Sequence, residues 1–162
     1  MYISTSEQHI EFLKNTVLKG VENAFENNQL IFGFMSLAQA IEILGAYLDD
    51  KPLRAKKQSL KRFSLAINRL FPKEYSKAND KNFLYYQLRA CMTHFFISTS
   101  RLSLNLGRDN KEKPHLSVID GVMLIYHENL LTDFRFAVSI LEKRILEGKL
   151  KLKPISFGKV ND

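Results

Sequence analysis

The sequence feature that most constrains the fold is a long apolar stretch from Leu30 to Leu48. Drawn as a helix, it carries apolar residues on nearly every side, which is typical of a helix surrounded by other elements. A membrane span needs about 20 predominantly apolar residues, and Gln39 and Glu42 in the middle of the stretch would be costly in a bilayer. We therefore expect a buried central helix over residues 30–49, and no membrane association.

Apolar residues at helical spacing predict four further helices around the central one. The first follows the capping-box sequence Thr5–Gln8, in which the Gln8 side chain can bond back to the cap residue. Pro72 is expected to end the third helix of the chain, because proline cannot continue helical hydrogen bonding. These four helices are expected at about residues 5–26, 56–71, 80–97 and 120–147.

The segment between the last two helices has a different pattern. Arg101–Leu106 and His115–Val118 alternate between apolar and polar residues on either side of the turn-rich Gly107–Asn110, which predicts a short hairpin or an extended loop. The basic tail at residues 148–162 is expected to be irregular. A chain of 162 residues suits one domain. We therefore expect a single all-α domain over residues 1–162, built as an antiparallel bundle of about five helices.

Composition places the chain among ordinary globular proteins, because 45% of its residues are hydrophobic and 25% are charged. The single cysteine, Cys91, cannot form a disulfide within the chain, which favours a reducing compartment. The first residues have neither a basic start nor an apolar core of the kind that marks a secretion signal. We expect a cytoplasmic protein.

Positive charge is concentrated in one segment of the chain. Between Lys51 and Lys81 there are ten Lys or Arg residues against Glu74 and Asp80, giving +8, so the rest of the chain sums to −1 within the total of +7. A basic patch of this kind attracts RNA, DNA or acidic lipid. An exposed helix face that only keeps the protein soluble would carry the same charge, and both interpretations stay open.

The predicted fourth helix has two apolar faces. One is a core face formed by Leu84, Leu88, Cys91, Met92 and Phe95, and the opposite face is formed by Tyr86, Ala90, Thr93 and Ile97. Arg89 and His94 lie on the two borders between these faces, about 140° apart. An apolar second face is explained if the helix lies centrally in the fold, if it lines a groove, or if a second copy of the protein packs on it. A symmetric dimer would bring two copies of each border residue toward one cleft.

Arg89 and His94 have the chemistry to cleave RNA without a metal ion. A histidine near neutral pH can take the proton of a ribose 2′-hydroxyl or return one to a leaving oxygen. The planar guanidinium of an arginine suits a phosphate and the charge that develops on it during transfer. At this spacing Arg89 could equally be a surface residue, with His94 packed near the end of its helix.

The stretch from Phe83 to His94 resembles the signature helix of the HEPN superfamily, in which an Arg is followed four to six residues later by a His. Residues 40–45 and 62–71 also resemble helices that precede this motif in the family. The resemblance implies an all-α bundle, dimerisation through the motif helix and, in many members, metal-independent RNA cleavage in toxin–antitoxin, abortive-infection or CRISPR systems. By position, Arg89 and His94 match the catalytic pair. Ala90 departs from the family, which commonly has a polar residue there.

No metal or cofactor is expected. His9, His115 and His127 are scattered along the sequence, without partners at the spacing that a zinc site requires. The seven glycines are dispersed, so there is no glycine-rich phosphate-binding loop. Cys91 falls on the core face of its helix, which favours a buried structural thiol over a nucleophile.

Two functional hypotheses remain. The first is an RNA-binding protein, and specifically a metal-independent endoribonuclease of a toxin or defence system, in which Lys57, Lys61 and Arg62 guide the RNA backbone. The second is a non-catalytic helical module that forms a homodimer, or binds a protein such as an antitoxin, through the second face of the fourth helix. The two differ in whether RNA or protein is the ligand of that helix.

Overall fold

The computed structural model describes residues 2–95 and 99–156, and its fold is mixed α/β. It is about 60% helical and contains a two-stranded and a three-stranded sheet, so the all-α class expected from the sequence is wrong. The error arises in the segment before the last helix, where five consecutive residues form a strand in place of a helical turn.

The helical elements are α1 (Ser6–Glu11), the π-helical η1 (Phe12–Leu18), α2 (Lys19–Glu26), α3 (Leu30–Ala46), α4 (Ser59–Leu70), α5 (Lys73–Ala78), the 3-10 turn η2 (Asp80–Asn82), the π-helical η3 (Tyr85–Ala90), α6 (Cys91–Phe95) and α7 (His127–Leu146). The capping box at the start of α1 is confirmed. Thr5 Oγ1 accepts from the Gln8 N–H over 3.3 Å, and Gln8 Oε1 accepts from the Thr5 N–H over 3.2 Å.

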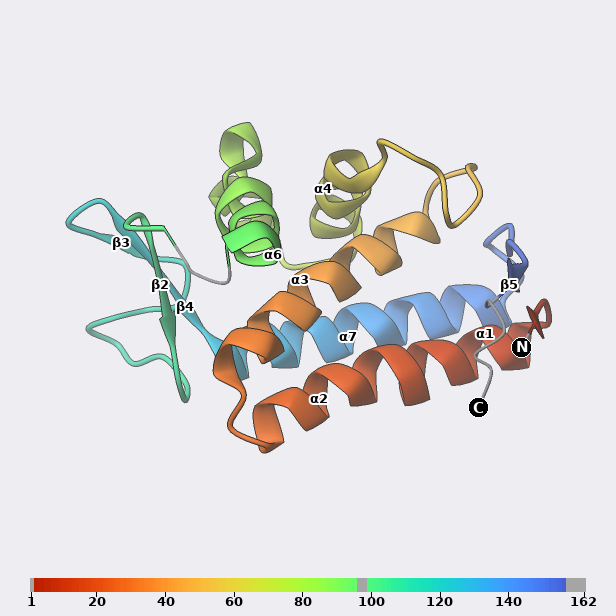
Figure 1. Cartoon of the computed structure of the whole chain (residues 1–162), viewed down its shortest axis with the longest axis horizontal. Coiled ribbons are helices and arrows are strands. Elements are labelled where there is room, and N and C mark those ends of the chain that lie inside the picture. The colour runs from red at the N-terminus through yellow and green to blue at the C-terminus, as the bar shows by residue number, and fades with distance from the viewer. Residues whose placement is uncertain (1, 96–98, 157–162) are drawn as a thin grey trace.

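Helix α3 is the buried central helix that the apolar stretch predicted. Phe34, Leu37, Ile41 and Leu44 on it have no exposed surface. Figure 1 shows α2 and α7 on one side of α3, and α4 and α6 on the other. Close packing of α3 on α4 depends on Gly45, since a Cβ atom there would lie 1.9 Å from the carbonyl oxygen of Arg62.

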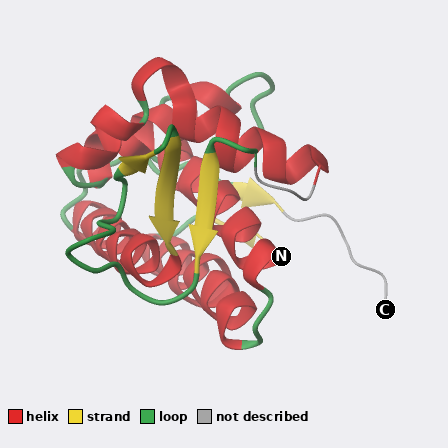
Figure 2. Cartoon of the chain, turned by 90° about the vertical axis from the view of Figure 1, so that its left-hand side faces the viewer, coloured by secondary structure: helices red, strands yellow, loops and turns green. Residues whose placement is uncertain are grey.

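The three-stranded sheet has the order β2-β4-β3 and lies at one end of the helical body (Figure 2). Strand β2 (Leu102–Asn105) pairs in parallel with β4 (Val122–Tyr126), and β3 (Val118–Ile119) pairs antiparallel with β4. The two alternating segments noted in the sequence therefore do not pair with each other as a hairpin. The hairpin that does form joins β3 to β4.

A tight turn at Asp120 and Gly121 explains why the last helix begins later than expected. Both residues have positive φ, 51° and 79°, as a two-residue turn between antiparallel strands requires. The chain leaves this turn as β4, buried at Met123 and Ile125, and α7 begins only at His127. The expectation of a helix from Asp120 missed this Asp-Gly hairpin signal.

Two further local expectations need correction. The segment after Pro72, where no helix was expected, is the short helix α5. The tail is not irregular throughout, because β5 (Ile155–Ser156) pairs antiparallel with β1 (Tyr2–Ile3). Ile3 and Ile155 face each other in that pairing, and both are buried. Within the described residues, no helix has the length and apolar character needed to cross a membrane.

Candidate functional site

The motif helix, formed by η3 and α6, carries Arg89 and His94 and differs from the regular helix expected over residues 80–97. Lys81 and Asn82 have positive φ, so the chain is kinked there, and the helix proper starts beyond them. Its first part, η3, is π-helical, with the Cys91 N–H donating to the Tyr86 carbonyl five residues back. Short π-helical segments within helices occur frequently at functional sites. Leu84, Leu88 and Met92 are buried as the core face predicted, and Cys91 is half-buried.

Arg89 is held by Glu42 of α3. Its Nε lies 2.9 Å from Glu42 Oε2, and its Nη2 lies 2.9 Å from the same oxygen. The two side chains are 19% and 23% exposed, so the ion pair lies at the surface but is not fully solvated. Both of these contacts are made by the Nε and Nη2 atoms of Arg89, and Nη1 takes part in neither of them. The guanidinium is thus fixed in orientation and can still contact an anion.

The position of Glu42 is itself fixed by a chain of hydroxyl groups. Ser59 of α4 donates a 2.6 Å hydrogen bond to Glu42 Oε2, and the Tyr85 hydroxyl donates to Ser59 Oγ over 3.1 Å. Three helical elements, α3, α4 and η3, therefore meet around one carboxylate. In the sequence, Glu42 stands out only as an interruption of an apolar stretch. A carboxylate on a buried helix is nevertheless a signal that a cationic partner lies nearby.

His94 lies on α6, and its side chain is exposed. It is five residues beyond Arg89 on the same continuous helical segment, so the structure places both on one surface-facing element. The angle of about 140° between them assumed α-helical geometry throughout. Arg89 belongs to η3 and His94 to α6. Because a π-helical turn is wider than an α-helical one, the angle between the two side chains differs from the value for a regular α-helix.

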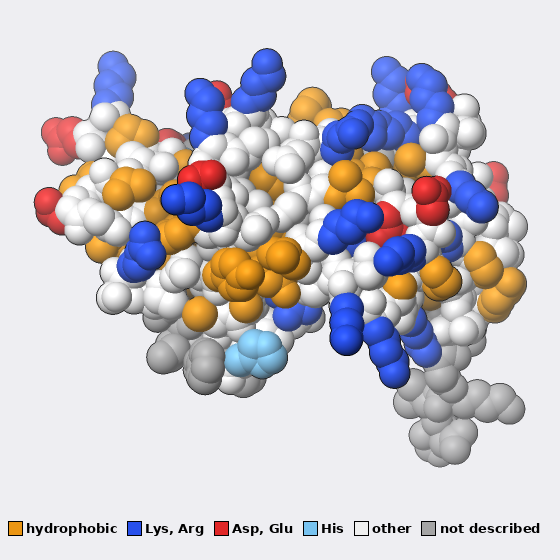
Figure 3. Space-filling model, turned by 90° about the horizontal axis from the view of Figure 1, so that it is seen from above, with side chains coloured by type: hydrophobic (Ala, Val, Ile, Leu, Met, Phe, Trp, Pro, Cys, Tyr) orange, Lys and Arg blue, Asp and Glu red, His pale blue; other side chains and the backbone are white. Residues whose placement is uncertain are grey.

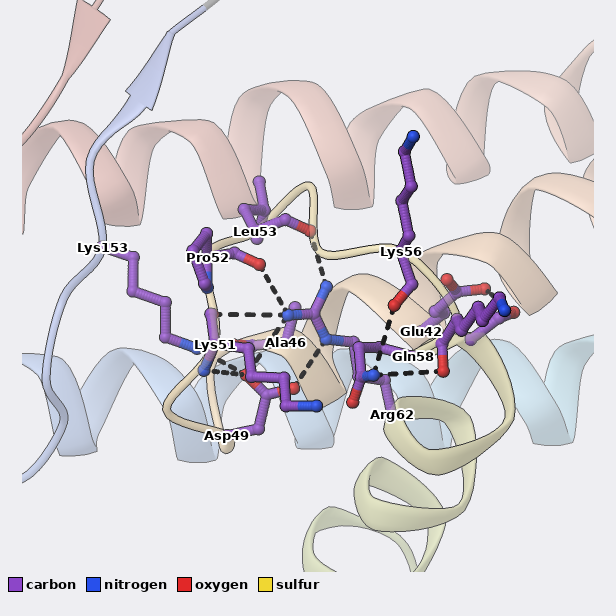
Figure 4. A network of polar contacts seen from close by, with 12 residues as sticks. Glu42, Ala46, Asp49, Lys51, Pro52, Leu53, Lys56, Gln58, Arg62 and Lys153 are labelled. Atoms are coloured by element: carbon purple, nitrogen blue, oxygen red, sulfur yellow. Dashed lines mark hydrogen bonds and ion pairs between the residues drawn. The ribbon is translucent and has the colours of Figure 1, made fainter.

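The three residues predicted to contact nucleic acid differ in their exposure to solvent. Lys57 and Lys61 are exposed, as expected, but the outward orientation expected for Arg62 is wrong. Its side chain is 4% exposed and lies 2.7 Å from Asp49 Oδ2. The guanidinium also donates to backbone carbonyls of the loop before α4, at Lys51, Pro52 and Leu53 (Figure 4). Arg62 is a structural residue that pins this loop.

Asp49 forms the centre of that buried network. Lys153 from the C-terminal segment approaches Asp49 Oδ1 to 2.8 Å and also donates to the Ala46 carbonyl. Burial raises the pKa of Asp49, but hydrogen bonds from Arg62 and Lys153 outweigh it and hold the pKa at about 2. The network therefore joins the end of α3, α4 and the C-terminal segment through a carboxylate that stays ionised.

The second face of the motif helix is partly exposed. Tyr86 is 49% exposed, and Ala90 and Thr93 are half-buried. The Thr93 hydroxyl donates to the Arg89 carbonyl over 2.7 Å, which satisfies the hydroxyl within its own helix. Ile97, the fourth residue assigned to this face, lies outside the described residues.

A cavity of about 480 Å³ opens beside Tyr86, between the motif helix and the β3–β4 turn. Three cationic side chains line it, those of Lys77, Lys81 and Arg101, against the single carboxylate of Asp80. Figure 3 shows that Lys and Arg side chains are spread over the face that carries α4 and α6, with a compact hydrophobic patch among them. The basic segment is evident from the sequence, but this cavity is not, because its opposite wall includes β4, where a helix was expected.

Aromatic and apolar groups complete the lining of this cavity. Phe83 and Tyr86 come from the helix side, and Val118 and Met123 come from β3 and β4. The Arg101 guanidinium carbon lies 5.3 Å from the centre of the Phe83 ring, in a cation–π contact that holds it at the rim. The cavity thus combines a flat apolar lining with positive charge.

A relay of polar groups around the buried Tyr75 hydroxyl joins α5, α7 and the loop between β2 and β3. The Tyr75 hydroxyl donates to Asp133 Oδ2 over 2.7 Å and lies 2.8 Å from His115 Nε2. His115 Nδ1 accepts from the Tyr126 N–H over 3.0 Å, so Nε2 must carry the ring proton and donate to Tyr75. Both ring nitrogens are engaged, and burial lowers the His115 pKa to about 4. This histidine has a structural role.

No family model, curated protein or solved structure matches this chain. Across residues 2–95 and 99–156, no group of three or more His, Cys, Asp or Glu side chains is placed to hold a metal ion. What the site can do therefore follows from its own residues.

Proposed function

We propose that this protein binds RNA and cleaves it at Arg89 and His94. The observation that carries the proposal is the ion pair with Glu42, which presents the Arg89 guanidinium in a fixed orientation on the helix that also exposes His94. A guanidinium held in a fixed orientation can bind a phosphate, and an exposed imidazole can transfer a proton. The HEPN resemblance of residues 83–94 supports the same assignment.

In the proposed reaction, His94 takes the proton of a ribose 2′-hydroxyl, and the 2′-oxygen forms a bond to the adjacent phosphorus. The bond from phosphorus to the 5′-oxygen breaks, and the imidazolium returns its proton to that oxygen. Arg89 stabilises the charge that builds on the phosphate oxygens. The products are a 2′,3′-cyclic phosphate end and a 5′-hydroxyl end, and neither proton transfer uses a metal ion.

The test is incubation of single-stranded RNA with the purified protein in a chelator, followed by analysis of the product ends. Wild type is expected to leave cyclic phosphate ends, and His94→Ala and Arg89→Ala are each expected to slow cleavage at least 100-fold, the usual size of a general acid–base contribution. Lys143→Ala, which removes an exposed cation from α7, is the matched control and should cleave at the wild-type rate. Equal rates for wild type and His94→Ala would refute the catalytic assignment.

The biological setting proposed is a toxin or defence system, as the HEPN resemblance implies. Induced expression of the wild type is then expected to arrest growth of a host bacterium, and His94→Ala is expected to be tolerated. An antitoxin would be a protein that restores growth when it is produced together with the wild type. Arrest by both forms at equal protein levels would contradict this setting.

The second candidate is a protein-interaction module that uses the other face of the motif helix. Its support is the exposure of Tyr86, a large ring that is 49% accessible next to the half-buried Ala90 and Thr93. In a homodimer of this kind, Ala90→Arg is expected to convert a dimer to a monomer in sedimentation analysis and to leave any interaction with RNA unaffected. A wild-type protein that is monomeric at micromolar concentration would exclude the homodimer.

A further inference from the structure

We infer that the cavity beside Tyr86 binds one unstacked base of a single-stranded RNA, with the flanking phosphates on Lys77, Lys81 and Arg101. This inference rests on the proposed function and specifies its substrate class. At about 480 Å³, the cavity lies within the range of about 300–1,000 Å³ typical of small-molecule sites. It is therefore large enough for a nucleotide unit and not for a helix of nucleic acid.

The charges around the cavity select an anion with an apolar part. Three cations against Asp80 leave a net charge of +2 on the lining. The same cavity has the rings of Phe83 and Tyr86 and the side chains of Val118 and Met123. A nucleotide has a phosphate for the cations and a flat base for the rings, whereas inorganic phosphate would use only the cations.

Tyr86 is the residue best placed to stack on a base. Its ring lines the cavity and is 49% exposed, so a ligand can reach it without rearrangement of the core. Neighbouring Tyr85 packs edge-on against it, with ring centroids 5.4 Å apart, which restricts its orientation. Aromatic side chains held in this way are the usual platforms for unpaired bases.

The position of Tyr86 also connects the cavity to the proposed cleavage site. Tyr86 precedes Arg89 by three residues in the π-helical η3, so the two residues lie less than one turn apart on the same element. A base stacked on Tyr86 would therefore place the next phosphates of the same strand along the helix toward Arg89. Bases in a duplex are stacked inside it and cannot enter such a cavity without unpairing.

The experiment measures the affinity of fluorescent RNA for the full-length protein by anisotropy, in the His94→Ala background so that the RNA stays intact. The probes are a 12-nucleotide single strand and a blunt duplex of the same sequence. Tyr86→Ala is expected to weaken single-strand binding about 5- to 100-fold. Tyr86→Phe, which keeps the ring, is the matched control and should bind within about twofold of the parent.

Charge is tested separately through the salt dependence of the same binding. Lys81→Ala is expected to reduce the slope of log affinity against log salt by about 0.7, the value for one phosphate contact on a single strand. The exposed Lys19→Ala on α2 is the control and should leave the slope unchanged.

Several results would overturn the inference while leaving the cleavage proposal intact: equal affinity for duplex and single strand, unchanged binding in Tyr86→Ala, or displacement of RNA by polyglutamate at the same charge concentration. A change in molecular mass for Tyr86→Ala, with RNA binding unchanged, would assign the residue to a protein interface instead. No detectable RNA binding by any form would refute both proposals, and cleavage that depends on His94 but not on Tyr86 would refute this one alone.

Discussion

The Tyr75 hydroxyl and the Asp133 carboxylate are joined by a 2.7 Å hydrogen bond that links α5 to α7 inside the protein. Tyr75 is 2% exposed and also contacts His115, which belongs to the loop between β2 and β3. One buried hydroxyl thus fastens the sheet-side loop to two helices. Desolvation and the nearby Asp133 both raise the pKa of Tyr75, so the hydroxyl stays protonated and remains a donor at neutral pH.

Removal of this hydroxyl is expected to destabilise the protein. Tyr75→Phe would leave Asp133 and His115 without their shared partner in a buried site, which costs about 1–3 kcal/mol of unfolding free energy. Urea denaturation followed by circular dichroism measures the loss. Tyr2→Phe, at a ring that is 60% exposed, is the control and should leave the midpoint unchanged. The relay would be shown to be unimportant if Tyr75→Phe had the wild-type midpoint.

The lowered pKa of His115 predicts that the folded protein loses stability in mild acid. Burial lowers its pKa to about 4 from an unfolded value of 6.5, so the folded state disfavours the charged ring. The resulting contribution is complete above pH 6.5 and is lost as the pH falls toward 4; it amounts to about 2 kcal/mol once partial exposure is allowed for. Urea midpoints at pH 7, 5.5 and 4.5 measure it. In His115→Asn, which has no ring proton to gain, the decline over this window should be shallower; an identical decline would contradict the assignment.

Arg62 is expected to be the most sensitive cation of the basic segment. Arg62→Ala would leave the buried Asp49 carboxylate without its main partner, and breaking such a pair costs about 3–5 kcal/mol. Arg69→Ala removes an exposed arginine from the same helix and is expected to change stability by less than about 0.5 kcal/mol. Thermal unfolding of the two variants decides between a structural and a surface role, since equal melting temperatures would contradict the buried network.

Two glycines give a matched test of the contact between α3 and α4. Gly45→Ala would place a methyl group against the Arg62 carbonyl, 1.9 Å from the oxygen, and should destabilise the fold by about 3 kcal/mol or more because backbone has to move. Gly20→Ala, on α2, meets no atom within 4 Å and should stabilise the fold by about 0.5–1 kcal/mol through helix propensity. Opposite signs in urea denaturation are the expected result, and a neutral Gly45→Ala would contradict the close crossing.

The sequence predicted those elements whose pattern was local and repeated. The central helix, the Thr5 capping box and the burial of Leu84, Leu88 and Met92 are confirmed because each depends on helical spacing within a few turns. Strand β4 was missed, and the extended segment that contains β2 was given the wrong partner, because the parallel pairing of β2 with β4 joins residues 21 apart in the chain. An Asp-Gly pair between Ile119 and Val122 was the local signal of the hairpin.

The candidate site was only partly predictable. Arg89 and His94 were singled out by their spacing, but the partner of Arg89 was not, because Glu42 lies 47 residues earlier on another helix. Arg62 was predicted to lie on the surface because its side chain is charged. A buried arginine is nevertheless acceptable when a carboxylate and several carbonyls surround it. Which cation is buried depends on partners that only the folded chain brings together.

The parallel pairing of β2 with β4 has a consequence for the order in which the protein is assembled. Strand β4 is the only strand of its three-stranded sheet that contacts both others, and it ends at Tyr126, after most of the helical body has been synthesised. Neither β2 nor β3 can be paired in this sheet before β4 has left the ribosome. During synthesis, Lys77, Lys81 and Tyr86 therefore emerge before the β3–β4 hairpin, which is the wall that turns their surface into a cavity.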